Sequence, residues 1–162
     1  MKRLTVCALL IGLLLCGCTK PGLRRDVPPE WPQEMTTALS LTLDGTQYTA
    51  DWTYQSGVSA YTLTAPQELL GVQIVCDGVE SRIESGNVQA ALPQQSVFLL
   101  LHGAYHALAG ALAAEPQLTQ EGWLYDGMDR YGFEALAQSG TLHIRFPREN
   151  AEAVFSIETP DE

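Results

Sequence analysis

Basic side chains are scarce in this sequence of 162 residues. Only 9 lysines and arginines stand against 19 aspartates and glutamates, and the formal net charge is -10 at pH 7. From residue 36 onward the imbalance grows, because four arginines stand against sixteen acidic residues. Proteins bind nucleic acid mainly by neutralising phosphates with clusters of Lys and Arg. The composition therefore argues against nucleic acid as a partner.

Motifs that mark enzymes are also missing. The sequence has no G-x-S-x-G nucleophile elbow, no glycine-rich phosphate loop and no C-x-x-C pair. His102 and His106 stand four residues apart, which places them on one face of a helix, and His143 could be a third metal ligand. The segment lacks the glutamate of the HExxH zinc motif, and histidines at the edge of an apolar helix face explain the pattern as well. We therefore expect no catalytic residue, no metal site and no cofactor.

An apolar run of about 20 residues, long enough to span a bilayer, is missing too. The N-terminus instead has Lys2 and Arg3, followed by an apolar stretch from Val6 to Cys16 that only Gly12 interrupts. A basic start followed by a short apolar stretch is typical of an export signal. The sequence therefore predicts a chain that is directed out of the cytoplasm.

The residues that follow, Leu15-Cys16-Gly17-Cys18, have the pattern of a bacterial lipobox: leucine, two small residues and the cysteine that receives the lipid. We expect residues 1–17 to be a lipoprotein signal peptide and Cys18 to be the lipidated residue. Acyl chains such as palmitate anchor a protein firmly when two are attached, because each buried methylene adds about 0.8 kcal/mol. The chain would then be lipid-anchored to the cell membrane on its extracytoplasmic face. A plain cleaved signal peptide or an uncleaved anchor is the alternative.

Cysteine is scarce beyond this point. Cys7 and Cys16 leave with the signal peptide and Cys18 is modified, so Cys76 is the one thiol that remains. An exported domain with one thiol has no internal disulfide. We expect Cys76 to be a small core residue on a strand.

Residues 18–35 contain four prolines and show neither helical nor strand periodicity. Such a segment is typical of an extended and solvated spacer. The sequence therefore predicts a proline-rich tether at 18–35 that separates a domain, residues 36–162, from the membrane.

The domain begins with short segments in which apolar and polar residues alternate. Leu39–Leu43 and Tyr48–Tyr54 flank Asp44-Gly45, a typical hairpin turn. Because each strand is apolar on one face, the resulting antiparallel sheet needs a cover on that face. Further alternating segments occur at 61–65, 70–76, 79–84, 88–92, 123–125, 131–133, 142–146 and 155–157.

The period changes between Pro93 and Glu115, where apolar residues recur every three or four positions. Ser96 is a suitable N-cap and Pro116 a suitable stop. The helix is apolar around most of its circumference, so we expect both of its sides to be buried. The fold class is therefore mainly β (α+β), with roughly ten strands and one main helix.

Three segments resemble a known family: Ala65-Pro66-Gln67-Glu68-Leu69-Leu70-Gly71, the Leu92-Pro93 start of the helix, and the closing strand from Gly140 to Pro147. Together with the order of the strands, they resemble the LolA/LolB-like lipoproteins over about residues 36–157. More narrowly, they resemble the Gram-positive branch of germination (GerS) and sporulation lipoproteins. The resemblance implies a strongly curved antiparallel sheet, an unclosed barrel, with the helix packed in its concave face. In carrier members that cavity holds the acyl chains of a lipid or lipoprotein.

The sequence departs from the carriers in two ways. It has one strong helix where they commonly use several, and it is itself lipidated whereas the soluble carrier is not. A firmly anchored protein does not diffuse between membranes, so a receiver, sensor or assembly role fits better than ferrying.

Apolar side chains from the strands and the helix could line an acyl-chain cleft, since such clefts are mostly apolar with few polar groups. They could equally be a filled core, because both arrangements bury the same side chains. The cleft candidates are Leu41, Trp52, Tyr61, Leu63, Ile74, Phe98, Leu101 and Tyr105.

Two functions of different classes stay open. The first is binding of a lipid or lipoprotein acyl chain by an anchored lipoprotein. The second is a non-enzymatic scaffold or assembly factor that docks a cell-envelope protein, for example a germination or peptidoglycan enzyme. A fully packed concavity would favour the second function.

Overall fold

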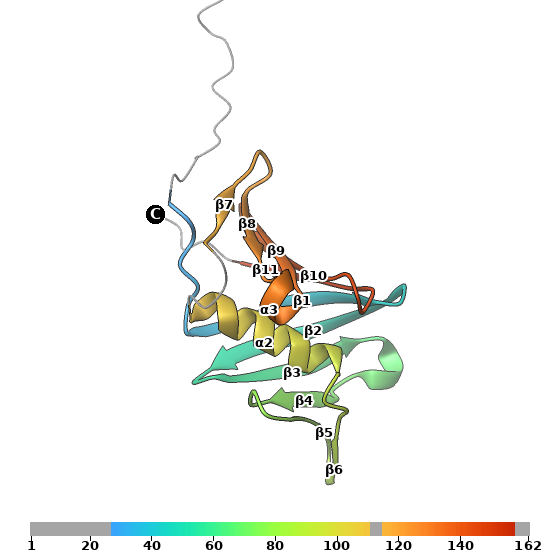
Figure 1. Ribbon diagram of the computed structural model, residues 1–162. Coiled ribbons are helices and arrows are strands. Elements are labelled where there is room, and N and C mark those ends of the chain that lie inside the picture. The colour runs from blue at the N-terminus through green and yellow to red at the C-terminus, as the bar shows by residue number, and fades with distance from the viewer. Residues whose placement is uncertain (1–26, 111–114, 158–162) are drawn as a thin grey trace, which may run out of the picture.

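The computed structural model describes residues 27–110 and 115–157, which form one antiparallel sheet around a helix (Figure 1). The predicted signal peptide and Cys18 lie outside the described residues. The sheet has eleven strands in the spatial order β6-β5-β4-β3-β2-β1-β11-β10-β9-β8-β7. In chain order they are β1 (Glu34–Leu43), β2 (Thr46–Gln55), β3 (Val58–Ala65), β4 (Gln73–Cys76), β5 (Ser81–Ser85), β6 (Val88–Ala91), β7 (Gln117–Leu118), β8 (Trp123–Asp126), β9 (Glu134–Gln138), β10 (Thr141–Phe146) and β11 (Ala151–Ser156).

Tight turns set the register of the first strands. β1 and β2 pair over their full length, from Glu34 opposite Gln55 to Leu43 opposite Thr46. Asp44 and Gly45, the two residues between the strands, have positive φ angles of 48° and 79°. Two left-handed residues in a row twist a hairpin in the sense that the strands need. The hairpin predicted from Asp44-Gly45 is confirmed.

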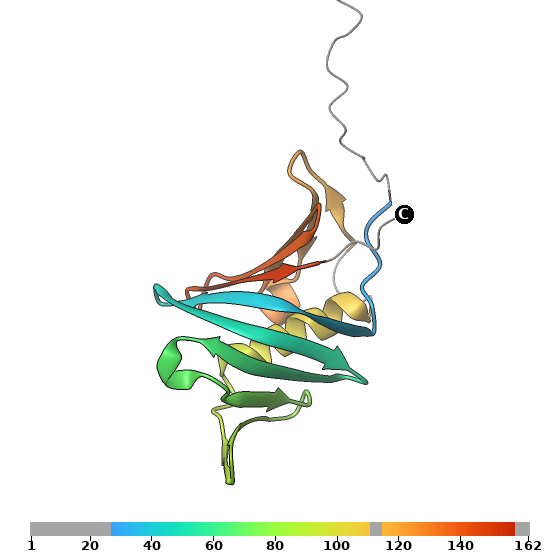
Figure 2. The ribbon, with the colours of Figure 1, turned by 180° about the vertical axis from the view of Figure 1, so that it is seen from behind.

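The sheet is curved and does not close into a barrel. Figure 1 shows the strands β1–β6 and the strands β7–β11 as two arms that bend around helix α2 (Val97–Ala109). Figure 2, from the opposite side, shows the strands in front of the helix. The predicted fold class, a curved unclosed antiparallel sheet with one main helix in its concave face, is confirmed.

The first and last strands lie side by side in the middle of the sheet. β1 pairs with β11, so that Leu39 is opposite Phe155 and Leu41 is opposite Ala153. The two arms are therefore joined through residues from opposite ends of the domain.

Helix α2 begins and ends at residues with clear local causes. The Ser96 hydroxyl accepts a hydrogen bond from the Leu99 N–H, which is the predicted N-cap. The helix ends at Ala109 with Gly110 as its C-cap, earlier than the predicted end near Glu115. Residues 111–114 lie outside the described part. Within that part, no helix is both long and apolar enough to cross a membrane.

The segment around Tyr131 and Phe133 differs from the predicted strand. Met128–Tyr131 form a short helix, α3, and β9 begins only at Glu134. The cause is a loop closed on Gly127, whose N–H donates to the Phe133 carbonyl and whose own carbonyl accepts from the Tyr131 N–H. A Cβ on Gly127 would lie 2.6 Å from the Phe133 ring. The alternation of Tyr131 and Phe133 therefore reflects the packing of Phe133 against Gly127, and it does not mark a strand.

Two further elements differ from the prediction. Gln67–Leu69 form a 3-10 turn, η1, and β4 begins at Gln73, so Leu70 is not on a strand and is exposed. The two-residue strand β7 was not predicted, because two residues show no periodicity.

The described end of the tether is not wholly solvated. Trp31 is half-buried against the core, and β1 begins at Glu34, two residues before the predicted domain boundary. The proline pattern predicts an extended segment, but it carries no information on what the segment contacts.

Candidate functional site in the concave face

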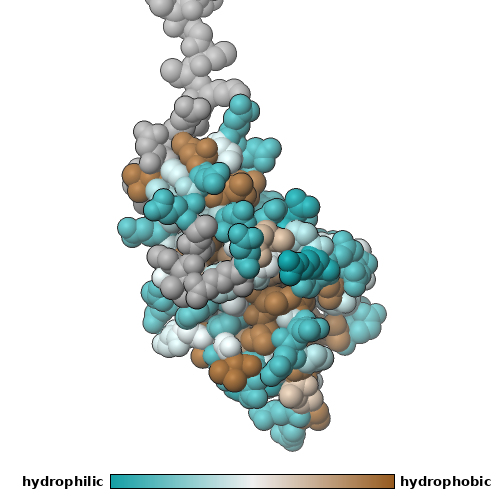
Figure 3. All heavy atoms as spheres, in the orientation of Figure 1, coloured by the Kyte–Doolittle hydropathy of each residue, from teal (hydrophilic) through white to brown (hydrophobic). Residues whose placement is uncertain are grey.

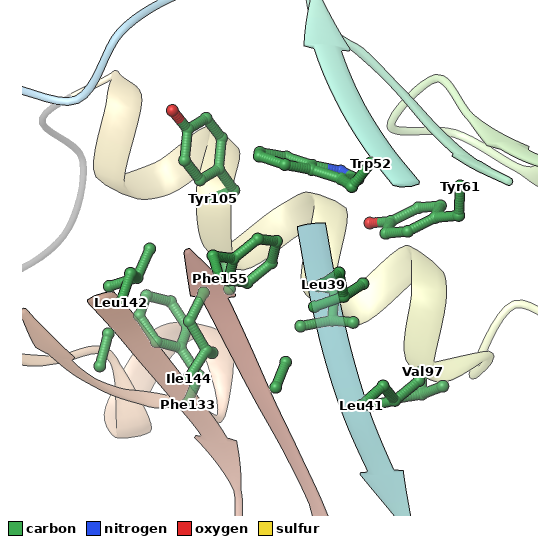
Figure 4. Close-up of a cluster of buried hydrophobic side chains, with 14 of the residues drawn as sticks. Leu39, Leu41, Trp52, Tyr61, Val97, Tyr105, Phe133, Leu142, Ile144 and Phe155 are labelled. Atoms are coloured by element: carbon green, nitrogen blue, oxygen red, sulfur yellow. The ribbon is translucent and has the colours of Figure 1, made fainter. Parts of the chain in front are cut away.

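The concave face of the sheet is lined by the inward residues of alternating strands. Trp52 on β2 pairs with Tyr61 on β3, and Tyr61 pairs with Ile74 on β4. Because side chains alternate along a strand, the three residues lie on one face. Figure 4 shows Trp52, Tyr61 and Tyr105 beside α2, with Phe155 and Leu142 from the other arm completing the cluster.

Aromatic rings fill the middle of the concavity. The ring centroid of Trp52 lies 4.7 Å from that of Tyr105 on α2 and 4.8 Å from that of Phe155 on β11, both in edge-on geometry. Tyr54 lies 4.9 Å from Tyr105. Edge-to-face pairs at this distance contribute about 0.5–1.5 kcal/mol beyond the area they bury. The cluster therefore joins β2, α2 and β11 into one core.

The structure brings the eight cleft candidates together around α2. Phe98 is half-buried, and its ring centroid is 5.1 Å from that of Tyr61; the other seven side chains are each at most 3% exposed. They contact one another and their neighbours, so the chain's own side chains occupy the concavity. Their role as ligand-binding residues stays a prediction.

Two hollows in the described part of the chain lie elsewhere. One of about 330 Å³ lies at the end of the β1–β2 pair, near Glu34 and Gln55. The larger, about 510 Å³, lies on the outer face of β8 to β11, over Leu124, Leu136 and His143. None of the eight candidates lines either hollow.

Five hydrogen bonds link α2 and its N-cap to the sheet. The Tyr61 hydroxyl donates to the Phe98 carbonyl at 3.1 Å. The other four join side chains: Ser81 Oγ to Ser96 Oγ at 2.8 Å, Ser59 Oγ to His102 Nδ1 at 3.0 Å, Tyr54 Oη to His106 Nδ1 at 2.7 Å, and Tyr105 Oη to Met35 Sδ at 3.3 Å. The buried face of α2 is otherwise mainly apolar and aromatic, as its composition predicts.

His102 and His106 lie on one helix face, as their spacing predicts, with ring centroids 6.0 Å apart. His143 is far from them in the fold, on the outer face of β10, with Nδ1 3.8 Å from a carboxylate oxygen of Glu152. Among the residues described, no three His, Cys, Asp or Glu side chains are grouped as metal ligands.

Burial lowers the pKa of His102, and the nearby His106 lowers it further, while the charge of Asp77 acts in the opposite direction. The side chain is 2% exposed. The backbone at Gly78 covers its Nε2, since a Cβ on Gly78 would lie 3.3 Å from that atom. His102 is therefore a neutral, hydrogen-bonded link between α2 and β3 at neutral pH.

Buried hydroxyl and thiol groups in the concavity are also un-ionised. Burial raises the pKa of Tyr61 well above its usual value, as it does for Tyr105. Burial and the charge of Asp77 raise the pKa of Cys76 to about 12. Because the thiolate is the nucleophile, this thiol is unreactive at neutral pH, which fits the predicted core role.

Two indole N–H groups are buried without a hydrogen bond of normal geometry, those of Trp31 and Trp52. Each lies near a tyrosine oxygen, Trp31 near Tyr125 and Trp52 near Tyr61. Burial raises the pKa of both tyrosines, and the neighbouring indole offsets part of that rise. A buried donor that lacks a partner costs about 1–3 kcal/mol. Burial of the apolar surface of each ring therefore has to offset the cost of its unpaired N–H.

Sequence reasoning missed several residues of this site. Phe155 was assigned to a strand but not to the cleft, because its neighbour β1 is far away in sequence. Ser59 was not considered, and its hydrogen bond to α2, like that of the expected aromatic residue Tyr54, is one that no local pattern encodes. Trp31 was assigned to the tether, although a tryptophan among prolines was a signal that the segment is not wholly solvated.

The sequence matches no protein-family model and no curated protein. Among solved structures, the chain is similar to a LolA superfamily protein from Nitrosomonas europaea, with a TM-score of 0.45 and 11% sequence identity. The similarity covers 78% of this chain and 85% of that chain. A likeness of this size does not establish membership of that superfamily, and the germination branch stays a prediction.

Proposed function

We propose that this chain is a membrane-anchored extracytoplasmic lipoprotein whose concave face binds an acyl chain of a lipid or lipoprotein. The observation that carries the proposal is the cover of that face. A broad apolar surface from both arms of the sheet is closed by a single 13-residue helix. Moving that helix would uncover an apolar surface lined by the cleft candidates.

Binding requires α2 to move, because the concavity is filled in the closed arrangement. Five hydrogen bonds hold the helix to the sheet, and each contributes about 0.5–1.5 kcal/mol net. An acyl chain would replace one set of apolar contacts with another, so the exchange of apolar area is nearly balanced. The apparent affinity for the acyl chain is then proportional to the fraction of molecules in which α2 has moved away from the sheet.

The outward side of α2 is not fully covered. Leu99 and Leu100 are only partly buried, and Figure 3 shows hydrophobic residues gathered over the helix among hydrophilic ones. A helix that is apolar on both sides keeps apolar contacts whether it lies on the sheet or on an acyl chain. This property supports a helix that changes position.

Native mass spectrometry with organic extraction tests the proposal. The full chain carrying Cys18→Ala would be purified after contact with envelope lipids, and we expect co-purifying acyl lipid. Leu101→Asn places an amide in the concave face and should abolish retention, whereas Leu99→Asn on the outward side should retain lipid. Thermal melting of both variants would check that each one folds. A folded wild-type chain that stays empty contradicts acyl-chain binding.

The anchor is tested separately. Cys18→Ala should move the protein from the membrane fraction to the soluble fraction, because the acyl chains supply the affinity for the bilayer. Mass spectrometry of the mature N-terminus should show a lipid on Cys18. Unchanged fractionation would contradict the proposed anchor.

A second candidate function is supported by the filled concavity. A non-enzymatic scaffold that docks a cell-envelope protein needs no internal cavity, and the packed core around Trp52 suits it. The same lipid experiment separates the two functions. A folded, empty wild-type chain that binds an envelope protein, with binding lost in Leu99→Asn, would favour the scaffold.

A further inference from the structure

The segment of residues 28–33, which we call the strap, crosses from β8 to the C-terminal end of α2 (Figure 1). The Tyr125 hydroxyl on β8 donates to the Pro29 carbonyl at 3.4 Å, and the Tyr105 hydroxyl on α2 donates to the Pro32 carbonyl at 2.9 Å. The Gln33 amide donates to the Ala109 carbonyl at 2.7 Å. The strap therefore spans the gap between one arm of the sheet and the helix.

Trp31 is the part of the strap that packs against the core. Its ring centroid lies 5.8 Å from that of Tyr125 and 6.5 Å from that of Tyr105, both in edge-on geometry. Tyr105 in turn contacts Trp52 in the middle of the concavity. The indole thus covers the end of the same apolar cluster that the cleft candidates form.

The strap is attached more weakly than a strand. It pairs with no strand, and each of its three hydrogen bonds joins one side-chain donor to one backbone carbonyl. The indole N–H of Trp31 is buried without a hydrogen bond of normal geometry, which offsets part of the gain from burying the ring. What holds Trp31 is apolar and aromatic contact, which an acyl chain can supply equally well.

We propose that the space between Tyr105 and Tyr125 is the entrance of the acyl-chain site, that Trp31 occupies it when no ligand is bound, and that an entering acyl chain displaces the strap. This inference rests on the proposed acyl-chain binding and adds the place and manner of entry. The headgroup of the lipid stays outside, near the exposed end of α2.

Displacement has a consequence for the tether. The strap lies between the domain and the predicted anchor at Cys18, so its release adds six residues to the free segment. Six extended residues span roughly 20 Å. Ligand binding would therefore increase the distance that the domain can reach from the membrane.

Titration with a fluorescent fatty acid tests the entrance. The full chain carrying Cys18→Ala would be compared with the same chain also carrying Trp31→Ala. We expect about tenfold tighter binding for Trp31→Ala, because the apparent Kd scales inversely with the fraction of chains whose entrance is free. Trp123→Ala is the matched control: Trp123 is also partly buried, lies on β8 with Tyr125, and is expected to leave the affinity unchanged.

Limited proteolysis of the Cys18→Ala chain gives a measurement that needs no change in the strap. A glutamate-specific protease should cleave after Glu30 faster when the fatty acid is bound, because a displaced strap is more accessible. If the Cys18→Ala chain binds, but Trp31→Ala binds no tighter and cleavage of the strap is unchanged, the entrance is wrong while acyl-chain binding stands. If neither chain binds the fatty acid, acyl-chain binding itself is wrong and the entrance with it.

Discussion

The two ends of α2 are held in different ways. The N-terminal end is fixed by the sheet, through Ser96 with Ser81 and through the Phe98 carbonyl with Tyr61. The C-terminal end bonds to the sheet through His106 with Tyr54 and through Tyr105 with Met35. It is also held by the strap, which belongs to no strand and bonds to Tyr105 and Ala109. Because part of what holds it lies outside the sheet, we expect the C-terminal end of the helix to be released first. The difference therefore predicts where the concave face opens.

The largest loss of stability should come from changing Trp52, which lies at the centre of the aromatic cluster between α2 and the sheet. Trp52 contacts Tyr105, Tyr54 and Phe155, so Trp52→Ala leaves a cavity in the shared cluster. We expect the free energy of unfolding to fall by about 3–5 kcal/mol, as measured by urea denaturation. Trp123→Ala, at a partly buried site on β8, should cost clearly less. An equal loss in both variants would show that the cluster has no special weight.

Ser96→Ala should destabilise the N-terminal end. It removes the helix cap and leaves the Ser81 hydroxyl, on a side chain that is 1% exposed, without its partner. We expect a loss of about 2 kcal/mol in the free energy of unfolding. Ser96→Thr keeps the hydroxyl and should retain most of the stability. A loss as large in Ser96→Thr would point to packing instead of the hydrogen bonds.

Tyr105→Phe should loosen the C-terminal end alone. The ring stays in the cluster, but the hydroxyl no longer donates to the Pro32 carbonyl. We expect a loss of about 1 kcal/mol and faster hydrogen exchange at the C-terminal end of α2, as at the Gly110 N–H, which donates to the His106 carbonyl. Exchange in the first turn of α2 should be unchanged. Equal acceleration at both ends of the helix would remove the difference between them.

The smallest effect should appear in the pH dependence of the free energy of unfolding. Because burial lowers the pKa of His102 below its usual 6.5, the unfolded chain binds more protons than the folded chain between these two pKa values. Stability should therefore decrease as pH falls from about 6.5 toward the lowered pKa. His102→Gln should flatten this part of the profile. A profile that keeps its slope in His102→Gln would assign the dependence to other groups.

The strands of the first arm could be predicted well because their burial is one-sided. In β1 to β3, alternation and the turns at Asp44-Gly45 and Ser56-Gly57 agree, and both turns have positive φ at each residue. Local rules failed where contacts are non-local. Phe133 looks like a strand residue by its neighbours, yet its environment is set by Gly127. The role of Trp31 depends on Tyr105 and Tyr125, which lie far along the chain.

The candidate site also has a part that could be predicted from local patterns and a part that could not. The inward residues of β2, β3 and α2 follow from periodicity, so the eight candidates fall in one cluster. Whether that cluster encloses a space depends on the sizes of side chains from both arms. Phe155 and Tyr54 fill the concavity, and their contacts become known only from the fold.

The pairing of β1 with β11 also sets the order in which the chain can fold. Until β11 has emerged, β1 has an unpaired edge, and the two arms have no common strand pair. Contacts between segments so far apart in sequence form late, because the closure of a long loop comes before them. A chain that leaves the cytoplasm unfolded would therefore expose the edge of β1 until β11 is across. During this interval the nascent domain is most open to pairing with another chain.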